Sequence, residues 1–541
     1  MASRSPITIL GISQIGYRPD EIKKAIVRVP CESETPFHQA AYEITAIGQS
    51  APAIQARMQI QAASNNGSGF YYIADFSKLN TPGSYRFSAR LSGPRGVTNI
   101  QSGVFCVEAN LWTDKVIPSQ YSFFDNYRCG VNCHTSAPVR GGYHDAAGDY
   151  VVRMWSIPHV AFGMSEYILC SSNPSPKALD ELKWTVDWLL ALQAPDGNVQ
   201  CLVIRREDEF SQYLRRPIDD SFRHFIEEEK YLPSRISYVA GLAHAARVFR
   251  TRDTNLADRC EAAAVRAWGR VSSHDWKSCG TGDMGNFLWS SVELFDLTED
   301  TNYLQQACAV VPLILRRQYL NPRRVQYGLY GDFFDDPLKT SFGDKQYKKF
   351  TWLGLYAGLV DLFRILPAQD PLRARIGQAL DIYFDNYVLR GAALTPYGQM
   401  ITGLEPTTNN QFRVFFFTHR DAWTGFHGLN VDHFAIGWVA AKYARLTGRK
   451  DLLDFANAQA QWVAGCNPLG YCMIDHLGWK NPPMLDDNIG TGRFAGGIPN
   501  GIIGDFNDRP DWAFGSTCWG SREYWLPHNA YLLALVPYLD P

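Results

Sequence analysis

The feature that most constrains the fold of this chain is a long succession of helical segments that begins after residue 110 and continues to the C-terminus. In ten or more segments apolar residues recur at α-helical spacing, and many segments come in pairs joined by short turns such as residues 447–451. Paired helices with no strand run between them favour a helical toroid or bundle over a βαβ fold. The predicted helices span residues 178–192, 234–249, 256–271, 287–297, 303–316, 350–365, 371–387, 431–446, 451–464 and 527–539.

The first hundred residues have a different pattern. Short segments rich in aromatic and β-branched residues, such as 24–29 and 84–90, alternate with turn residues such as Asn66-Gly67. About a hundred residues of short strands predict a β-sandwich. We therefore expect two domains, a sandwich at residues 1–109 and a helical domain at residues 110–541.

Composition limits the classes of partner. With 46% hydrophobic residues among 541 the chain can bury a large core, and its formal charge of −2 gives no reason to expect a nucleic-acid partner. No run of 18 apolar residues predicts a membrane helix. Phosphate-loop, dinucleotide-binding and Gly-x-Ser-x-Gly patterns are absent, so we expect neither nucleotide nor serine-hydrolase chemistry, and no organic cofactor. The oligomeric state is not indicated.

The N-terminal segment and the cysteines bear on the compartment. The first ten residues lack the apolar stretch of a signal peptide, and most of the 12 cysteines stand alone in apolar segments, which favours a reducing compartment. We expect a cytoplasmic protein if this start is native, and a secreted or periplasmic one if a signal has been removed.

Five long irregular stretches separate the predicted helices. They hold most of the aromatic and Asp residues outside the helices, and long loops of this kind commonly carry function. We expect them to form the walls of one cleft. The stretches are residues 117–154, 196–232, 322–349, 393–430 and 467–526.

The first candidate group is a pair of carboxylates in residues 141–150, GGYHDAAGDY. Asp145 and Asp149 stand four residues apart in a Gly-rich stretch, next to aromatic residues that include Tyr143, and a helix is expected from near Trp155. Paired carboxylates beside aromatic rings suit acid–base chemistry on a sugar. The alternative is that one Asp forms an Asx-turn or caps the helix.

The second candidate is Glu523, which precedes the last predicted helix and lies next to Trp519, Tyr524 and Trp525. A carboxyl group among aromatic rings is desolvated, and desolvation raises its pKa toward that of a general acid. The alternative is a Glu that pairs with Arg522 or caps the following helix.

The third candidate consists of Cys129, Cys133, His134 and His144. Two thiols and two imidazoles are a possible ligand set for a tetrahedral structural Zn²⁺. A metal here would hold the catalytic loop, because His144 directly precedes Asp145. The alternatives are thiols without a metal or a disulfide between Cys129 and Cys133.

The fourth candidate is the turn at residues 465–468, GCNP, which leads from a helix into a long stretch containing Trp479, Asp486 and Asp487. The turn is consistent with a helix end that runs into a cleft loop. The alternative is an ordinary turn followed by solvated acids.

Four motifs in order resemble glycoside hydrolase family 9, the inverting cellulase family, in its branch with an N-terminal immunoglobulin-like domain. Residues 12–19 are similar to the opening of that domain, 141–150 to the family's catalytic loop, 465–468 to its G-x-N-P turn, and 508–530 to its terminal region. The resemblance implies an (α/α)6 barrel after the immunoglobulin-like sandwich.

The resemblance also implies roles for individual residues. Asp149 matches the general base that activates water, Asp145 the carboxylate that helps to hold this water, and Glu523 the general acid. The Cys and His residues named above match the zinc ligands of this branch. As substrate-binding residues we expect aromatic side chains and additional acids of the cleft stretches, namely Tyr143, Trp479, Asp486, Asp487, Trp519 and Trp525.

The sequence departs from the family pattern in two places. The loop from Asp145 to Asp149 has one residue more than the common form, and the longer form resembles branches that act on the ends of short oligosaccharides, including glucosaminides. The family's motif of paired His and Arg residues, which bind glucan in typical endo-cellulases, is absent between Trp479 and Ile498, where residues 481–488, NPPMLDDN, and later Arg493 stand instead.

The resulting hypothesis is an inverting hydrolase of β-1,4-linked gluco-configured oligosaccharides or polysaccharides that acts on the ends of short chains, whether glucosides or glucosaminides. An endo-β-1,4-glucanase is the alternative. A non-catalytic carbohydrate-binding protein and a lyase on a similar barrel are hypotheses from other classes.

Overall fold

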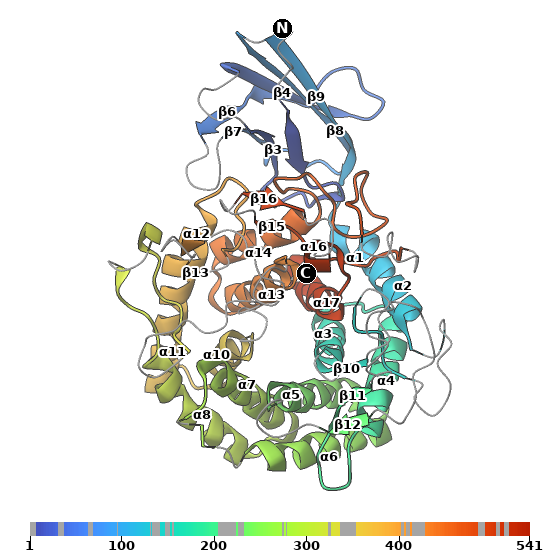
Figure 1. The fold of residues 1–541 in the computed structure, drawn as a ribbon, viewed down its shortest axis with the longest axis vertical. Coiled ribbons are helices and arrows are strands. Elements are labelled where there is room, and N and C mark those ends of the chain that lie inside the picture. Colours follow the sequence, from blue (N-terminus) through green and yellow to red (C-terminus); the bar gives the residue numbers. More distant parts are fainter. Residues whose placement is uncertain are drawn as a thin grey trace.

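The computed structural model describes most of the chain. The described residues are 7–30, 37–62, 69–94, 96–129, 131, 141–146, 152–153, 156–203, 223–225, 232–272, 275–276, 278–322, 326–335, 353–401, 405–406, 412–413, 428–484, 493–504, 509–512 and 519–540. Figure 1 shows a β-sandwich at one end of the molecule and a ring of helices below it.

The sandwich consists of two sheets that enclose their own core. One sheet has the order β1 (Ile9–Ile12), β3 (Lys24–Val29), β7 (Phe70–Asp75) and β6 (Gln59–Ala62), with neighbours antiparallel. The other has the order β2 (Gly16–Tyr17), β9 (Gly96–Val107), β8 (Gly83–Gly93), β4 (Gln39–Ala46) and β5 (Ile54–Arg57), with β2 parallel to β9.

Strand β8 shows why these residues form a sandwich. Its side chains alternate along the strand, with Tyr85, Phe87, Ala89 and Leu91 buried and their neighbours exposed or half-buried. Successive side chains of a strand point to opposite faces, so this alternation fixes which face of β8 packs into the core.

The helical domain is built on a closed inner ring of helices. Each helix of the ring contacts the next, and the last contacts the first. In order these are α3 (Ile157–Cys170), α5 (Leu232–Phe249), α7 (Thr281–Thr298), α10 (Leu353–Ile365), α13 (Asn430–Thr447) and α17 (Leu526–Leu539).

A second layer of helices packs around this ring. Most of them follow or precede their inner partner in the chain, as the paired segments in the sequence predicted. The outer helices are α2 (Ile117–Tyr127), α4 (Pro176–Ala191), α6 (Thr254–Val271), α8 (Thr301–Leu315), α11 (Pro371–Tyr383) and α14 (Lys450–Val463). This arrangement is an (α/α)6 barrel, and the predicted fold class is confirmed.

The remaining described elements are short connections. They are α1 (Leu111–Lys115), β10 (Val152–Arg153), β11 (Gln200–Val203), β12 (Arg223–Phe225), η4 (Gln326–Gly328), the π-helical turn η5 (Phe384–Leu389), α12 (Arg390–Ala392), β13 (Glu405–Pro406), β14 (Phe412–Arg413), β15 (Ile503–Gly504), β16 (Pro510–Asp511) and α16 (Trp519–Arg522). None of the described helices combines the length and the apolar character needed to cross a membrane.

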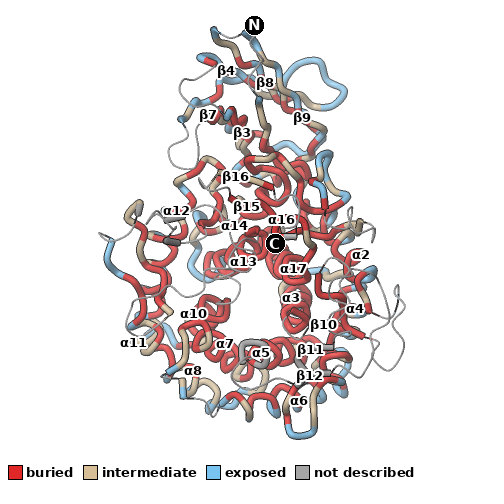
Figure 2. The backbone as a smooth tube through the Cα atoms, viewed as in Figure 1, coloured by how far each residue is buried: buried red, intermediate tan, exposed pale blue. Residues whose placement is uncertain are grey.

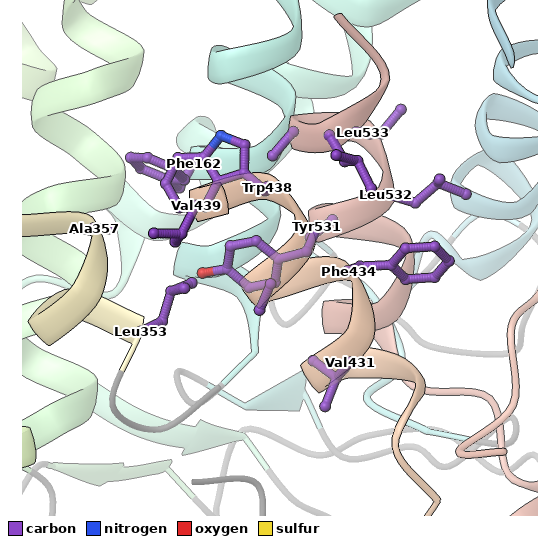
Figure 3. Close-up of a cluster of buried hydrophobic side chains, with 14 of the residues drawn as sticks. Phe162, Leu353, Ala357, Val431, Phe434, Trp438, Val439, Tyr531, Leu532 and Leu533 are labelled. Atoms are coloured by element: carbon purple, nitrogen blue, oxygen red, sulfur yellow. The ribbon is translucent and has the colours of Figure 1, made fainter. Parts of the chain in front are cut away.

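Burial follows the two layers. Inner helices such as α13 and α17 are buried on nearly all sides, whereas outer helices such as α6 are buried on one face (Figure 2). A helix that is apolar all round belongs inside a protein, and an amphipathic one at its surface. Figure 3 shows Phe162 of α3, Trp438 of α13 and Tyr531 of α17 packed together, with Phe162 and Trp438 ring centroids 5.4 Å apart.

One prediction about the loops is wrong. Residues 117–154 were expected to be irregular throughout, but residues 117–127 form helix α2. Its Pro118 favours the first turn, and its buried residues are largely aromatic. Aromatic residues have low helix propensity, so the helix depends on tertiary packing that local sequence patterns do not report.

The sandwich is joined to the barrel through the turn at residues 465–468. The backbone N–H groups of Ile12 and Gln14 donate to the carbonyl oxygens of Gly465 and Ala464, at 3.1 and 2.8 Å. A Cβ atom at Gly11 would lie 2.7 Å from the carbonyl oxygen of Asn467, so the two backbones approach too closely for any side chain. The last sandwich strand ends at Val107 and the first helix begins at Leu111.

Candidate active site

The Asp145 segment follows helix α2 and pairs with the chain just beyond that helix. Arg128 and Tyr143 form an antiparallel bridge, and the N–H of Cys129 donates to the carbonyl oxygen of Gly142 at 3.0 Å. Gly141 and Gly142 have φ angles of 138° and 63°, which only glycine adopts without strain. The Gly-Gly pair therefore lets the chain turn sharply just before Asp145.

Side chains of helix α4 hold this segment from outside. The Tyr143 hydroxyl donates to Glu181 at 2.8 Å, and the Arg128 guanidinium forms two bonds to the same carboxylate, at 2.8 and 3.2 Å. The indole of Trp184 donates to the carbonyl oxygen of Gly142 at 2.9 Å. Burial raises the pKa of Glu181, and the bonds from Arg128 and Tyr143 oppose that rise. The segment is thus anchored to an outer helix of the barrel.

This anchoring bears on the expected role of Tyr143. The side chain has no exposed surface, and burial beside Glu181 raises the pKa of its hydroxyl well above the usual value. In this position Tyr143 holds the loop, and its ring has no surface on which a sugar could stack.

Asp145 lies against the segment that precedes the last helix. The Ser156 hydroxyl donates to the Asp145 carboxylate and accepts a hydrogen bond from the indole of Trp525 at 3.2 Å. The backbones meet at the same point, where Ala146 and Trp525 form an antiparallel bridge. Asp145 and Trp525, which are 380 residues apart in the sequence, are therefore brought into one site.

Glu523 belongs to that same C-terminal segment, between α16 and α17. Its carbonyl oxygen accepts from the N–H of Asn500 at 2.9 Å, and Tyr524 forms a bridge with Pro499. Glu523 is half-buried, whereas Tyr524 is fully buried. Trp525 has extended backbone angles, φ −146° and ψ 128°. Because side chains alternate along an extended chain, we expect Glu523 to lie on the same side as Trp525, with Tyr524 on the other side.

Several predicted site residues lie outside the described residues. They are Asp149, Cys133, His134, Asp486 and Asp487. Trp519 begins helix α16, and its side chain is likewise not described.

Two of the four predicted zinc ligands are described and lie close together. The backbone N–H of His144 donates to the carbonyl oxygen of Tyr127 at 3.1 Å, and the backbone of Cys129 pairs with that of Gly142 beside the same antiparallel bridge. This register puts Cys129 and His144 on one face, diagonally across the pair, and both are buried, with 0% and 4% of their surface exposed. A thiol and an imidazole in this position fit a structural zinc site. Among the described residues alone there is no cluster of three or more candidate ligands.

Trp479 lies at the junction of the two domains. It is 40% exposed and covers Gly103 of strand β9, where an added Cβ atom would come within 2.5 Å of its ring. Its backbone N–H donates to the side-chain oxygen of Gln14 at 2.9 Å. Its ring is therefore engaged by the sandwich.

The sequence-based reasoning missed Asp475, which is only 1% exposed. Its carboxylate accepts from the Tyr524 hydroxyl at 2.5 Å, from Arg493 Nε at 3.0 Å and from the N–H of His476 at 3.0 Å. A single Asp after the apolar residues Cys472-Met473-Ile474 was the available signal, since a buried charge needs partners. Ser156 and Glu181 were missed as well.

Comparison with known proteins bears on both domains. Residues 8–93 match the sequence profile described as cellulase N-terminal ig-like domain, and residues 101–485 match that of glycosyl hydrolase family 9. The second match covers well over half of the chain. This chain belongs to glycosyl hydrolase family 9. The resemblance found in the four sequence motifs is confirmed.

Curated relatives within the family are distant. Endoglucanase D of Acetivibrio thermocellus is 23% identical over 351 residues, which are 54% of this chain and 52% of that protein. The xyloglucan-specific endo-beta-1,4-glucanase BoGH9A of Bacteroides ovatus is 23% identical over 408 residues, or 68% of this chain and 61% of that protein. The chain thus spans about half the length of the first of these relatives and about three-fifths of the second.

Solved structures of the family share the whole fold. A metagenome-derived family 9 endoglucanase matches with a TM-score of 0.69 at 18% identity, covering 98% of this chain and 99% of that one. A family 9 protein of Bacteroides ovatus matches with a TM-score of 0.65 at 16% identity, covering 98% of both chains. The sandwich and the barrel are therefore shared along the full described length.

Proposed function

We propose that this chain is an inverting glycoside hydrolase that cleaves β-1,4-linked gluco-configured oligosaccharides. Asp149 acts as the general base on water, Asp145 helps to hold that water, and Glu523 protonates the departing oxygen. Water adds to the anomeric carbon as the glycosidic carbon–oxygen bond breaks, and its proton passes to Asp149.

The observation that carries this proposal is the meeting of two distant segments. The Ala146–Trp525 bridge and the hydrogen bonds through Ser156 bring the loop of Asp145 beside the segment of Glu523. An inverting enzyme needs its carboxylates on opposite sides of the scissile bond with room for water, about 6.5–9.5 Å apart. One carboxylate segment comes from the beginning of the barrel domain's sequence and the other from its end. Two separate segments that meet at one site suit that requirement.

For the mode of action we propose cleavage at the ends of short chains, either glucosides or glucosaminides. The support is the additional residue between Asp145 and Asp149 and the absence of the family's motif of paired His and Arg residues between Trp479 and Ile498. The alternative is an endo-β-1,4-glucanase, which is favoured by the names of the curated relatives, an endoglucanase and a xyloglucan-specific endo-glucanase.

We also propose that Cys129, Cys133, His134 and His144 hold one structural Zn²⁺. The support is the common buried face of Cys129 and His144. Such an ion would tie the loop of Asp145 to the end of helix α2 without taking part in bond cleavage. Metal analysis of the purified protein should give about one Zn²⁺ per chain, and less than about half would contradict this assignment.

The test of the activity is turnover on a panel of cellobiose, longer cello-oligosaccharides, chitosan oligosaccharides and soluble β-glucan. Monosaccharide as the first product identifies an end-acting enzyme, and mixed oligomers from β-glucan identify an endo-glucanase. The first-formed product of a substrate with a β-linkage should be the α-anomer by NMR, and a β-anomer would contradict inversion.

Variants at the proposed carboxylates complete the test. Asp149→Asn and Glu523→Gln should lower turnover by about a hundredfold or more, since a positioned acid or base contributes about 10²–10⁴-fold. Oligosaccharide binding without turnover in the wild type would instead favour a carbohydrate-binding protein. Unsaturated products that absorb ultraviolet light would identify a lyase.

A further inference from the structure

Behind the Glu523 segment lies a buried carboxylate that the proposed reaction does not use. Asp475 lies in the long stretch after helix α14. Two side chains bind its carboxylate, one a guanidinium and the other a phenol hydroxyl. Arg493 bonds it through both Nε, at 3.0 Å, and Nη2, and Tyr524 bonds it through its hydroxyl at 2.5 Å. Because Arg493 and the N–H of His476 also hold this carboxylate, Asp475 is a fixed point to which Tyr524 is attached.

The ring of Tyr524 is enclosed as tightly as its hydroxyl. Phe123 of α2 and Phe494 pack against its faces and edges, with centroids 6.0 and 6.4 Å away. A Cβ atom added at Gly497 would lie 2.8 Å from the ring, so this glycine leaves just enough room for it. The ring is therefore closely packed, and the hydrogen bond to Asp475 holds its hydroxyl end.

The backbone transmits this position to the neighbouring residue. Tyr524 points to the Asp475 side, whereas Trp525 points to the opposite side, where its indole meets Ser156 and so Asp145. Glu523 lies on the same side as Trp525 by the alternation of an extended chain. A shift or rotation of Tyr524 would therefore move the Glu523 carboxyl relative to the Asp145 loop.

We propose that Tyr524, fixed by its hydrogen bond to Asp475, is a positioning residue for the general acid Glu523. This inference rests on the proposed function of Glu523. Tyr524 does not touch the substrate; it sets the direction from which Glu523 delivers its proton to the departing oxygen. Proton delivery depends steeply on such placement, because a displacement of about 1 Å can cost about a hundredfold in rate.

A substrate that needs no proton on its leaving group distinguishes positioning from a general structural role. In a cello-oligosaccharide the departing alkoxide must be protonated by Glu523 as the bond breaks. In 2,4-dinitrophenyl β-cellobioside the dinitrophenolate leaves as a stable anion, and water and its activating base are still required. Loss of acid positioning alone therefore slows the first reaction and spares the second.

The decisive variant is Tyr524→Phe, which removes the hydroxyl and keeps the ring. On cellotetraose we expect kcat to fall about tenfold with little change in KM, and on 2,4-dinitrophenyl β-cellobioside less than about twofold. Asp475→Asn should show the same selectivity, because it weakens the same attachment. Equal losses on both substrates, or unchanged kcat on cellotetraose, would overturn the proposal.

Two controls complete the design. Tyr538→Phe removes a buried hydroxyl that donates to Glu166 at 2.7 Å at the far end of helix α17, and it should not change the ratio of the two activities. Glu523→Gln should lose nearly all activity on cellotetraose but retain activity on 2,4-dinitrophenyl β-cellobioside. If Glu523→Gln keeps wild-type activity on both substrates, the proposed function fails; if it behaves as expected while Tyr524→Phe resembles the wild type, only this inference fails.

Discussion

Individual residues outside the Asp145 loop determine how that loop is held. Glu181 illustrates this, because its carboxylate accepts hydrogen bonds from both the Arg128 guanidinium and the Tyr143 hydroxyl. Only 4% of this residue is exposed. A buried carboxylate is costly unless its partners are well aligned, and removal of one partner leaves the others uncompensated. The geometry of the Asp145 loop therefore depends on helix α4.

We predict that Glu181→Gln loosens this loop. The amide has only one acceptor oxygen, so it cannot accept both hydrogen bonds of the Arg128 guanidinium together with that of Tyr143. We therefore expect the free energy of unfolding to fall by about 2 kcal/mol, and kcat to fall with it. Urea unfolding and turnover on the preferred oligosaccharide measure the two effects.

The matched control is Asp187→Asn on the same helix α4. Asp187 pairs with Lys183 at 2.8 Å, but both side chains are about half exposed. An exposed pair contributes little, so the unfolding free energy should change by less than about 0.5 kcal/mol. Similar losses in both variants would show that Glu181 has no special role.

At the scale of elements, the inner helices are connected near their C-terminal ends by a buried polar network. Every helix of the inner ring contributes to it, so the network spans the ring at the end away from Ser156 and Trp525. Its members are Glu166 of α3, His244 of α5, Glu293 of α7, Asp361 of α10, Lys442 of α13 and Tyr538 of α17.

We predict that Lys442→Met destabilises the barrel strongly. Lys442 lies 2.7 Å from Asp361 and 3.8 Å from Glu166, and both carboxylates are almost fully buried. Burial acts to lower the pKa of Lys442, but the nearby carboxylates outweigh it and raise that pKa above its usual value, so the ammonium stays charged. Without the ammonium of Lys442, the buried carboxylates of Asp361 and Glu166 lose their shared cation. We therefore expect the free energy of unfolding, measured with urea, to fall by about 3–5 kcal/mol.

Lys450→Met is the control for this prediction. Lys450 forms an ion pair with Asp454 at 2.6 Å, but its side chain is 68% exposed. We expect a change within about 0.5 kcal/mol. A small effect at Lys442 as well would mean that the network relaxes or admits water.

His244 should make the stability of the barrel dependent on pH. Its two ring nitrogens lie 3.0 Å from Glu166 and 2.7 Å from Glu293. Burial lowers the pKa of His244, but the two carboxylates more than offset this and raise it above 6.5. A raised histidine pKa stabilises the fold fully below the unfolded-state value, and this contribution is lost as the pH rises through the folded-state value.

The prediction is a difference between two titrations. The free energy of unfolding of the wild type, minus that of His244→Gln, should decrease from pH 6 toward pH 9. The difference is needed because burial also raises the pKa of Glu21 to about 7 and that of Asp540 to about 6. These two groups give the wild type and His244→Gln the same additional pH dependence, which cancels in the difference. A difference that is constant over this range would contradict a charged His244.

At the scale of the whole molecule, one side chain connects the sandwich to the loop that contains Asp475. Gln14 donates to the carbonyl oxygen of Gly470 at 2.9 Å, and its oxygen accepts from the N–H groups of Trp479 and Lys480, both at 2.9 Å. The same stretch holds Asp475, which attaches Tyr524. The sandwich therefore supports the stretch that holds Asp475 and, through it, Tyr524.

We predict that Gln14→Ala costs about 2–3 kcal/mol, because three buried or half-buried backbone groups lose their partner. Activity should fall as well, with the loop between Gly470 and Lys480 less well held. The control is Gln55→Ala, which removes one exposed bond to Glu43 at 2.8 Å and should change stability by less than about 0.5 kcal/mol. Equal losses of stability and activity in the two variants would contradict this prediction, because they would show that Gln14 has no special role at the domain junction.

Several features followed from the sequence by itself. Helical spacing after residue 110 and alternation such as Tyr85, Phe87, Ala89 and Leu91 determined the two-domain architecture, because these periodicities report which face of each element is apolar. The four motifs determined the family, and they pointed to the loop of Asp145 and to Glu523.

Only the tertiary structure decided what these segments touch. It turned residues 117–127 into a helix, buried Tyr143 against Glu181, set Trp479 over the sandwich and revealed Asp475 behind Tyr524. The physical reason is the same in each case. A local pattern shows that a side chain must be buried, but the partner that satisfies its polar atoms comes from another part of the chain, as Ser156 does for Trp525.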